Sequence, residues 1–123
     1  QDIADISAYY AGQGGNPEVP DTAAPAPARV AELLTKGACA SCHGANFNKP
    51  IDGTYPKIAG QHADYLYVAL RSYRTQGNPN IGRANPIMGG IVQQFSNAEL
   101  KAMADYLGSL PGDLRTVPQS RFR

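Results

Sequence analysis

Apolar residues recur at helical spacing in three segments of the chain, residues 29–36, 62–76 and 97–110. The side chains expected to face inward from these segments are Val30, Leu33, Leu34, Tyr65, Leu66, Ala69, Leu70, Tyr73, Leu100, Met103, Ala104 and Leu107. No segment shows the alternation of β-branched and polar residues that is typical of a half-buried strand. The pattern therefore predicts an all-α fold with three core helices and long loops.

Glycine, proline and capping residues indicate where these helices begin and end. Gly37 directly follows the first segment, and Gly108 and Pro111 are expected to end the last one. Ser96 or Asn97 can cap the start of the last helix with a side-chain oxygen. These residues set the expected ends of the first and last helices.

Glycine, asparagine and proline also concentrate between the helices. They predict two long loops, at residues 44–60 and 77–90. Residues 17–27 hold four prolines, each of which fixes φ and removes a backbone donor. This stretch is therefore expected to be an extended, semi-rigid linker, with an ordered surface loop as the alternative.

A shorter amphipathic segment, Asp2 to Ala11, precedes the linker. Ile3, Ile6 and Tyr10 fall on one face of it at helical spacing, and three glycines follow. The chain is thus expected to divide into an extra N-terminal helix (1–16), a Pro/Ala-rich linker (17–28), a main domain (29–110) and a polar, basic tail (111–123).

Residues 2–10 also resemble residues 99–107 at an offset of 97, with the acid, two apolar positions and a tyrosine in common. Either the first helix is the closing helix of a preceding, homologous domain, or two short amphipathic helices agree by chance. In the first case the apolar face of the first helix has lost its partner surface, and burying it elsewhere is energetically favourable. We therefore expect residues 1–11 to pack on their own domain or on another copy, with a homodimer as one outcome.

Composition and charge narrow the class of protein. The 123 residues are 42% hydrophobic, which suits one small domain with a core. Residues 1–28 carry four acidic and no basic residues, and residues 29–123 carry 11 basic and six acidic residues. This imbalance and a pI of about 8.0 are too mild for a nucleic-acid binder. No apolar stretch approaches the roughly 20 residues of a membrane span. A start at Gln1, without a signal-peptide core, predicts a processed or excised product.

The strongest chemical signal is the run Cys39-Ala40-Ser41-Cys42-His43. C-x-x-C-H is the covalent haem attachment sequence. Two thiols three positions apart on a helical turn can reach the two vinyl groups of one porphyrin, and the next residue, His43, can supply an imidazole nitrogen to the iron. A thioredoxin-like thiol pair is the main alternative, but it requires a βαβ setting. A zinc site is disfavoured because no second ligand pair exists.

Four motifs together resemble the class I cytochromes c, most closely the bacterial c4-type domains. They are Cys39-Ala40-Ser41-Cys42-His43-Gly44, Tyr55-Pro56-Lys57-Ile58-Ala59-Gly60-Gln61, Asn85-Pro86-Ile87-Met88 and the helix from Glu99 to Tyr106. The resemblance covers about residues 29–110. It implies a domain in which the N- and C-terminal helices cross around a single covalent haem c, and a location in the bacterial periplasm.

The sixth ligand of the iron follows from the family's pattern and from the methionine count. The chain has only Met88 and Met103. Met103 belongs to a helix face and is expected in the core, whereas Met88 lies in the Pro/Gly-rich loop where the family places its ligand. His62 is the rival, because two histidines can also ligate haem iron.

Further haem contacts are implied by the resemblance. In the family, the axial histidine donates its other N–H to a proline carbonyl, and Pro56 is the matching residue here. Gln61, Tyr65 and Arg71 are candidates for the haem propionates. The tyrosines of the middle helix either line the haem or are simply half-buried side chains.

The predicted function is one-electron transfer with transient redox partners. With histidine and methionine on the iron no open position is left, so the domain is not expected to be an enzyme. The alternative is a haem domain excised from a larger di-haem cytochrome or multi-domain redox enzyme. A thiol oxidoreductase, which would show free thiols and no visible colour, is a third reading.

Overall fold

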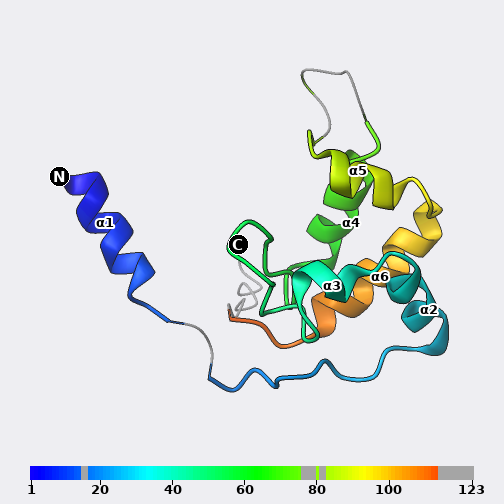
Figure 1. Cartoon of the computed structure of the whole chain (residues 1–123), viewed down its shortest axis with the longest axis horizontal. Helices are drawn as coiled ribbons and strands as arrows, with labels where there is room; N and C mark the ends of the chain where they lie inside the picture. Colours follow the sequence, from blue (N-terminus) through cyan, green and yellow to red (C-terminus); the bar gives the residue numbers. More distant parts are fainter. Residues whose placement is uncertain (15–16, 76–79, 81–82, 114–123) are drawn as a thin grey trace, which may run out of the picture.

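Six helices and no strand are present in the part of the chain that the computed structural model describes, residues 1–14, 17–75, 80 and 83–113 (Figure 1). The helices are α1 (Asp2–Ala11), α2 (Ala28–Lys36), α3 (Cys39–His43), α4 (Ala63–Ser72), α5 (Pro86–Val92) and α6 (Asn97–Ser109). The predicted all-α class is confirmed. The tail residues 114–123, with their arginines, lie outside the described residues.

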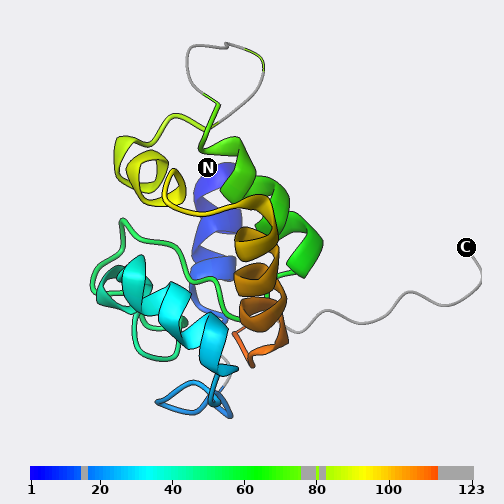
Figure 2. The ribbon, with the colours of Figure 1, turned by 90° about the vertical axis from the view of Figure 1, so that its right-hand side faces the viewer.

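The C-terminal helix α6 is the centre of the core. It lies beside α4 along much of its length and also packs against α2 (Figure 2). Leu100, Met103, Ala104 and Leu107 of α6 are all buried, as the helical period predicts. The other buried apolar side chains are Val30, Leu33, Leu34, Phe47, Leu66, Val92, Phe95 and Leu110.

Local chemistry explains where α6 starts. Ser96 Oγ accepts a hydrogen bond from Glu99 N, and the Glu99 carboxylate accepts one from Ser96 N, which is a complete capping box. The same carboxylate receives Arg29 Nη2 of α2 at 2.5 Å. Glu99 therefore caps the start of α6 and also connects α6 to α2, the first helix of the main domain. This supports the predicted contact between these two helices.

The end of α6 differs from the prediction. Gly108 lies inside the helix, which continues to Ser109. A Cβ at this position would be 2.9 Å from Gln61 O and 3.1 Å from Ala63 N. Gly108 is therefore present because the chain entering α4 approaches the α6 backbone closely, and it is not a helix terminator.

The middle helix α4 is shorter than predicted. It ends at Ser72, and residues 73–74 form a turn, while Gln76 lies outside the described residues. Leu66 is buried and Leu70 is half-buried against the core, but Tyr65 is 49% exposed and does not belong to the buried face.

The largest correction concerns the predicted loop 77–90, which contains α5. Asn85 Oδ1 accepts hydrogen bonds from Ile87 N at 3.0 Å and Met88 N at 3.1 Å, so its side chain caps the helix. Pro86 occupies the first turn, where its missing N–H costs nothing. The Asn-Pro pair is typical of a loop, but in the structure it begins a helix.

The proline-rich stretch after α1 lies on the main domain as an ordered surface segment. The Tyr106 hydroxyl donates to Ala24 O at 2.5 Å, and Asn46 Nδ2 donates to Pro20 O at 2.8 Å. Ala23 and Ala26 pack against the core. The alternative of an ordered surface loop therefore describes residues 17–27 better than a free linker.

Helix α1 lies away from the other helices (Figure 1). None of its residues is buried, and Ile3, Ile6 and Tyr10 are 82%, 58% and 69% exposed. The expected helix is present, but burial of its apolar face on its own domain is not observed. Packing on another copy stays a prediction.

Candidate functional site

The two cysteines and His43 lie on one helical turn. Helix α3 packs against α2, and Ala38 between them has a left-handed backbone conformation with φ of 52°. Both cysteine side chains are half-buried. The spacing on this turn is the arrangement that covalent attachment to one porphyrin requires.

The His43 ring is held in one orientation. The side chain is 7% exposed, and Nδ1 lies 2.8 Å from the carbonyl oxygen of Pro56. A carbonyl oxygen can only accept, so Nδ1 carries the proton and donates it. Nε2 is then the nitrogen that can bind a metal, which is the pattern of a ligating histidine with a backbone acceptor. The contact predicted for Pro56 is thus present in the structure.

The segment that carries Pro56 is itself anchored. Ile58 N and Ala59 N both donate to Phe47 O, at 2.9 and 3.0 Å. Lys57 is paired with Asp113, whose carboxylate also accepts from Asn48 Nδ2 at 2.8 Å. These contacts hold the Pro56 carbonyl where His43 needs it.

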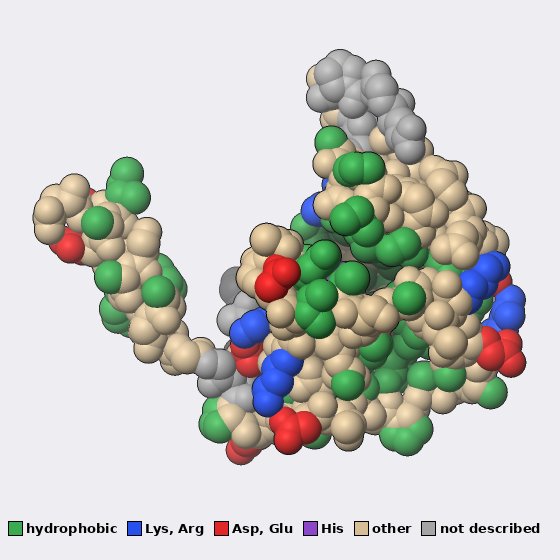
Figure 3. Space-filling model, in the orientation of Figure 1, with side chains coloured by type: hydrophobic (Ala, Val, Ile, Leu, Met, Phe, Trp, Pro, Cys, Tyr) green, Lys and Arg blue, Asp and Glu red, His purple; other side chains and the backbone are tan. Residues whose placement is uncertain are grey.

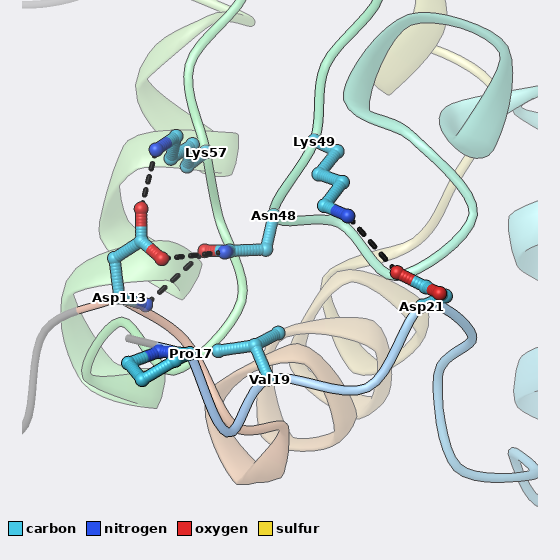
Figure 4. Close-up of a pocket in the computed structure, with 7 residues that line it drawn as sticks. All are labelled: Pro17, Val19, Asp21, Asn48, Lys49, Lys57 and Asp113. Carbon is cyan, nitrogen blue, oxygen red and sulfur yellow. Dashed lines mark hydrogen bonds and ion pairs between the residues drawn. The ribbon is translucent and has the colours of Figure 1, made fainter. Parts of the chain in front are cut away.

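The Lys57–Asp113 pair also borders a shallow polar pocket of about 420 Å³, lined further by Pro17, Val19, Asp21, Asn48 and Lys49 (Figure 4). Lys49 Nζ lies 2.9 Å from Asp21. Both lysines of the pocket therefore have carboxylate partners, and the pocket is the seam between residues 17–21 and the loop after the haem motif.

The structure separates the two methionines. Met103 is 3% exposed within the core on α6, as predicted. Met88 is half-buried at the edge of the core on α5. The rival ligand His62 is exposed and immediately precedes α4. Among the three, only Met88 combines an apolar setting with a side chain that is not already enclosed.

A hollow lined by hydrophobic side chains lies between α5 and α3 on the face of the molecule shown in Figure 3. An apolar hollow beside α3, the helix that carries both cysteines and His43, fits the porphyrin of a covalent haem. No group of three or more His, Cys, Asp or Glu side chains that could hold a metal ion occurs in the described ranges.

The comparison with known proteins agrees with this geometry. The family model for cytochrome c matches residues 27–111. The chain belongs to the cytochrome c family. It is 33% identical over 118 residues to cytochrome c4 of Azotobacter vinelandii, covering 89% of this chain and 54% of that protein. It is 38% identical over 72 residues to cytochrome c-553 of Nitratidesulfovibrio vulgaris, covering 58% of this chain and 69% of that one.

A solved structure gives the same result. The crystal structure of reduced recombinant cytochrome c4 from Pseudomonas stutzeri matches with a TM-score of 0.58 and 27% identity, over 72% of this chain and 47% of that one. The chain spans about half the length of the cytochrome c4 relatives it matches. The predicted class I cytochrome c fold and its c4-type resemblance are confirmed.

As a member of this family, the chain carries haem c, bound covalently through Cys39 and Cys42, and it functions in electron transfer. None of the described helices of this cytochrome c domain is long and apolar enough to cross a membrane.

The environment of Cys39 also disfavours the thiol-oxidoreductase alternative. Burial raises the pKa of the Cys39 thiol, with a smaller contribution from the nearby Cys42. A redox-active or nucleophilic cysteine needs a lowered pKa, because the thiolate is the reacting form.

This predicts slow alkylation of Cys39 in the haem-free chain. Since a raised pKa leaves less thiolate at any pH below it, Cys39 should react with iodoacetamide at pH 8 more slowly in the folded chain than in urea. Peptide mass spectrometry gives the rate. Faster labelling in the folded chain would show that burial does not control the reactivity of this thiol.

The three propionate candidates lie on α4 or just before it. Gln61 is exposed, and its Oε1 accepts from His62 N at 2.9 Å. The Arg71 guanidinium lies 5.4 Å from the ring centroid of Tyr67. The Tyr65 hydroxyl accepts from Arg83 Nη2 at 2.5 Å.

Arg83 is the residue that sequence reasoning missed. It lies in the predicted loop, and its aromatic partner comes 18 positions earlier on α4. No local pattern in the sequence connects the two positions.

Proposed function

We propose that this cytochrome c domain holds its haem iron between His43 and Met88 and cycles it by one electron. The observation that carries this proposal is the orientation of the buried His43 ring. Its Nδ1–H donates a hydrogen bond to the Pro56 carbonyl, so Nε2 is available to bind the iron. The bound haem supplies the iron that is oxidised and reduced.

The chain's own residues control how that happens. Cys39 and Cys42 keep the haem attached, and the Pro56 carbonyl makes the His43 imidazole a better donor. A Met88 thioether opposite His43 favours the reduced iron and raises the potential. Gln61, Tyr65 and Arg71 are our candidates for holding the propionates, because all three are exposed polar side chains at or near α4.

With both axial positions filled, this domain has no position left for a substrate. It therefore acts as a carrier and not as an enzyme, and meets its redox partners by small, transient contacts. The location is the bacterial periplasm, in keeping with the bacterial source of the cytochrome c4 relatives.

A redox titration of the purified protein tests the proposal. The haem should follow a single one-electron Nernst curve at a positive potential, and the mass should exceed that of the chain by one haem. Acid-acetone should leave the colour with the protein. Haem extracted into the organic phase, or a potential typical of two histidine ligands, would contradict it.

A second candidate is that this is one haem domain of a longer di-haem cytochrome or multi-domain redox enzyme. It is favoured by the exposed apolar face of α1, by the offset repeat and by the coverage of only about half of the c4 relatives. The length of the full gene product decides it.

The exposed apolar face of α1 can also be covered by a second copy of this chain, in a homodimer through residues 1–11. Sedimentation of the chain with and without residues 1–16 tests this, because only the longer chain should run as a dimer. If both chains sediment as monomers, and α1 exchanges its amide hydrogens like an unfolded peptide, the homodimer is contradicted.

A further inference from the structure

Arg83 connects the segment before α5 to helix α4. Its guanidinium lies 5.5 Å from the ring centroid of Tyr65 and 5.7 Å from that of Tyr73, and Nη2 donates to the Tyr65 hydroxyl at 2.5 Å. A planar guanidinium can stack on rings and donate at its edge at the same time, which lysine cannot do. Hydrogen bonding to Tyr65 raises the pKa of Arg83, so the group is charged at every ordinary pH.

The backbone of Arg83 continues the connection in both directions. Its N–H donates to Ser72 O, at the end of α4, at 3.1 Å. Its carbonyl oxygen accepts from Asn85 N at 3.0 Å. Arg83 therefore contacts α4 through both its main chain and its side chain, and its carbonyl oxygen accepts a hydrogen bond from Asn85.

Asn85 carries this anchorage into α5. Its side chain caps the helix by accepting from Met88 N at 3.1 Å, besides Ile87 N. The contacts thus run without a break from the tyrosines of α4, through Arg83 and Asn85, to the backbone of Met88.

We propose that Arg83 is a positioning residue, which fixes the N-terminus of α5 against α4 and thereby keeps the Met88 thioether directed at the haem iron. This rests on the proposed role of Met88 as the axial ligand. Without the anchor, α5 moves more freely relative to α4, and the thioether leaves the iron more often.

Displacement of the methionine by added imidazole measures this directly. In ferric protein, Arg83→Ala should bind imidazole at least about tenfold faster than the wild type, the change that loss of one charged hydrogen bond produces. Tyr65→Phe, which removes the acceptor but keeps the ring, should show a smaller increase.

Arg74→Ala is the matched control. Arg74 also carries a positive charge just after α4, but its Nη1 donates to Asn97 Oδ1 at 2.5 Å, and so it contacts the start of α6. The control should bind imidazole at the wild-type rate. If Arg83→Ala does not fold, as judged by circular dichroism, Tyr65→Phe carries the test.

The proposal is overturned if Arg83→Ala and Arg74→Ala bind imidazole equally fast. A changed potential with an unchanged imidazole rate also overturns it, because Arg83 then acts as a charge near the haem propionates. Failure of the axial assignment is seen separately, in the Met88→Ala spectrum, which does not depend on Arg83.

Discussion

Replacing Met88 with alanine is expected to abolish the weak near-infrared sulfur-to-iron band of the ferric protein and to lower the reduction potential markedly. The thioether is a soft ligand that favours reduced iron, and its removal leaves water or an added base to fill the position. Because Met88 is only half-buried, the variant should keep its fold and its covalent haem. Visible spectra and a redox titration measure both effects.

Met103→Leu is the control for this result. Met103 is buried on α6 among core side chains, and leucine conserves its volume, so the band and the potential should stay at wild-type values. Loss of the band in the Met103 variant, with an unchanged band in Met88→Ala, would reverse the assignment.

Gly44→Ala is expected to give the largest loss of stability of any single change at the site. Gly44 directly follows His43, and its backbone has φ of 93° and ψ of 159°, a region that is essentially restricted to glycine. A Cβ there would be 2.2 Å from the carbonyl oxygen of Lys49. Strain of about 1–3 kcal/mol and overpacking of about 1–3 kcal/mol together predict a destabilisation of several kcal/mol.

Guanidinium unfolding of the haem protein measures the loss of stability, and the yield of covalent haem shows whether the attachment turn still forms. Gly53→Ala is the matched control in the same loop, since nothing lies within 4 Å of a Cβ there and its φ is ordinary. Equal stabilities of the two variants would show that the close approach of Gly44 to Lys49 is not a constraint in solution.

Local patterns in the sequence predicted much of the site because its chemistry is local. Five consecutive residues contain both attachment points and His43, the proposed axial ligand, and α3 spans these same residues. The inward faces of α2 and α6 were also predicted correctly, since the helical period and a capping box depend only on residues within a few positions. The assignment of Met88 as the second ligand rests on a count of methionines and a resemblance, and it stays a prediction.

The errors have a common physical origin. Asn85 and Pro86 are typical of loops, yet they begin α5, because capping and a first-turn proline favour a helix once the segment packs on α4. Gly108 is in the middle of α6 because another part of the backbone approaches it, which no local pattern encodes. Tyr65 is at an inward position by period but is half-exposed beside Arg83.

The sequence by itself therefore predicted the helical class and the covalent haem with its two attachment points, because each depends on residue types within one helical turn or one helical period, and electron transfer followed from the family resemblance. Only the tertiary structure decided that the proline-rich segment lies on the domain, that Asp113 steadies the loop carrying Pro56, and that Arg83 joins α5 to α4. These contacts connect residues 18 to 82 positions apart. The packing of the helices decides which of these residues meet, and the local sequence around each residue does not predict its partner.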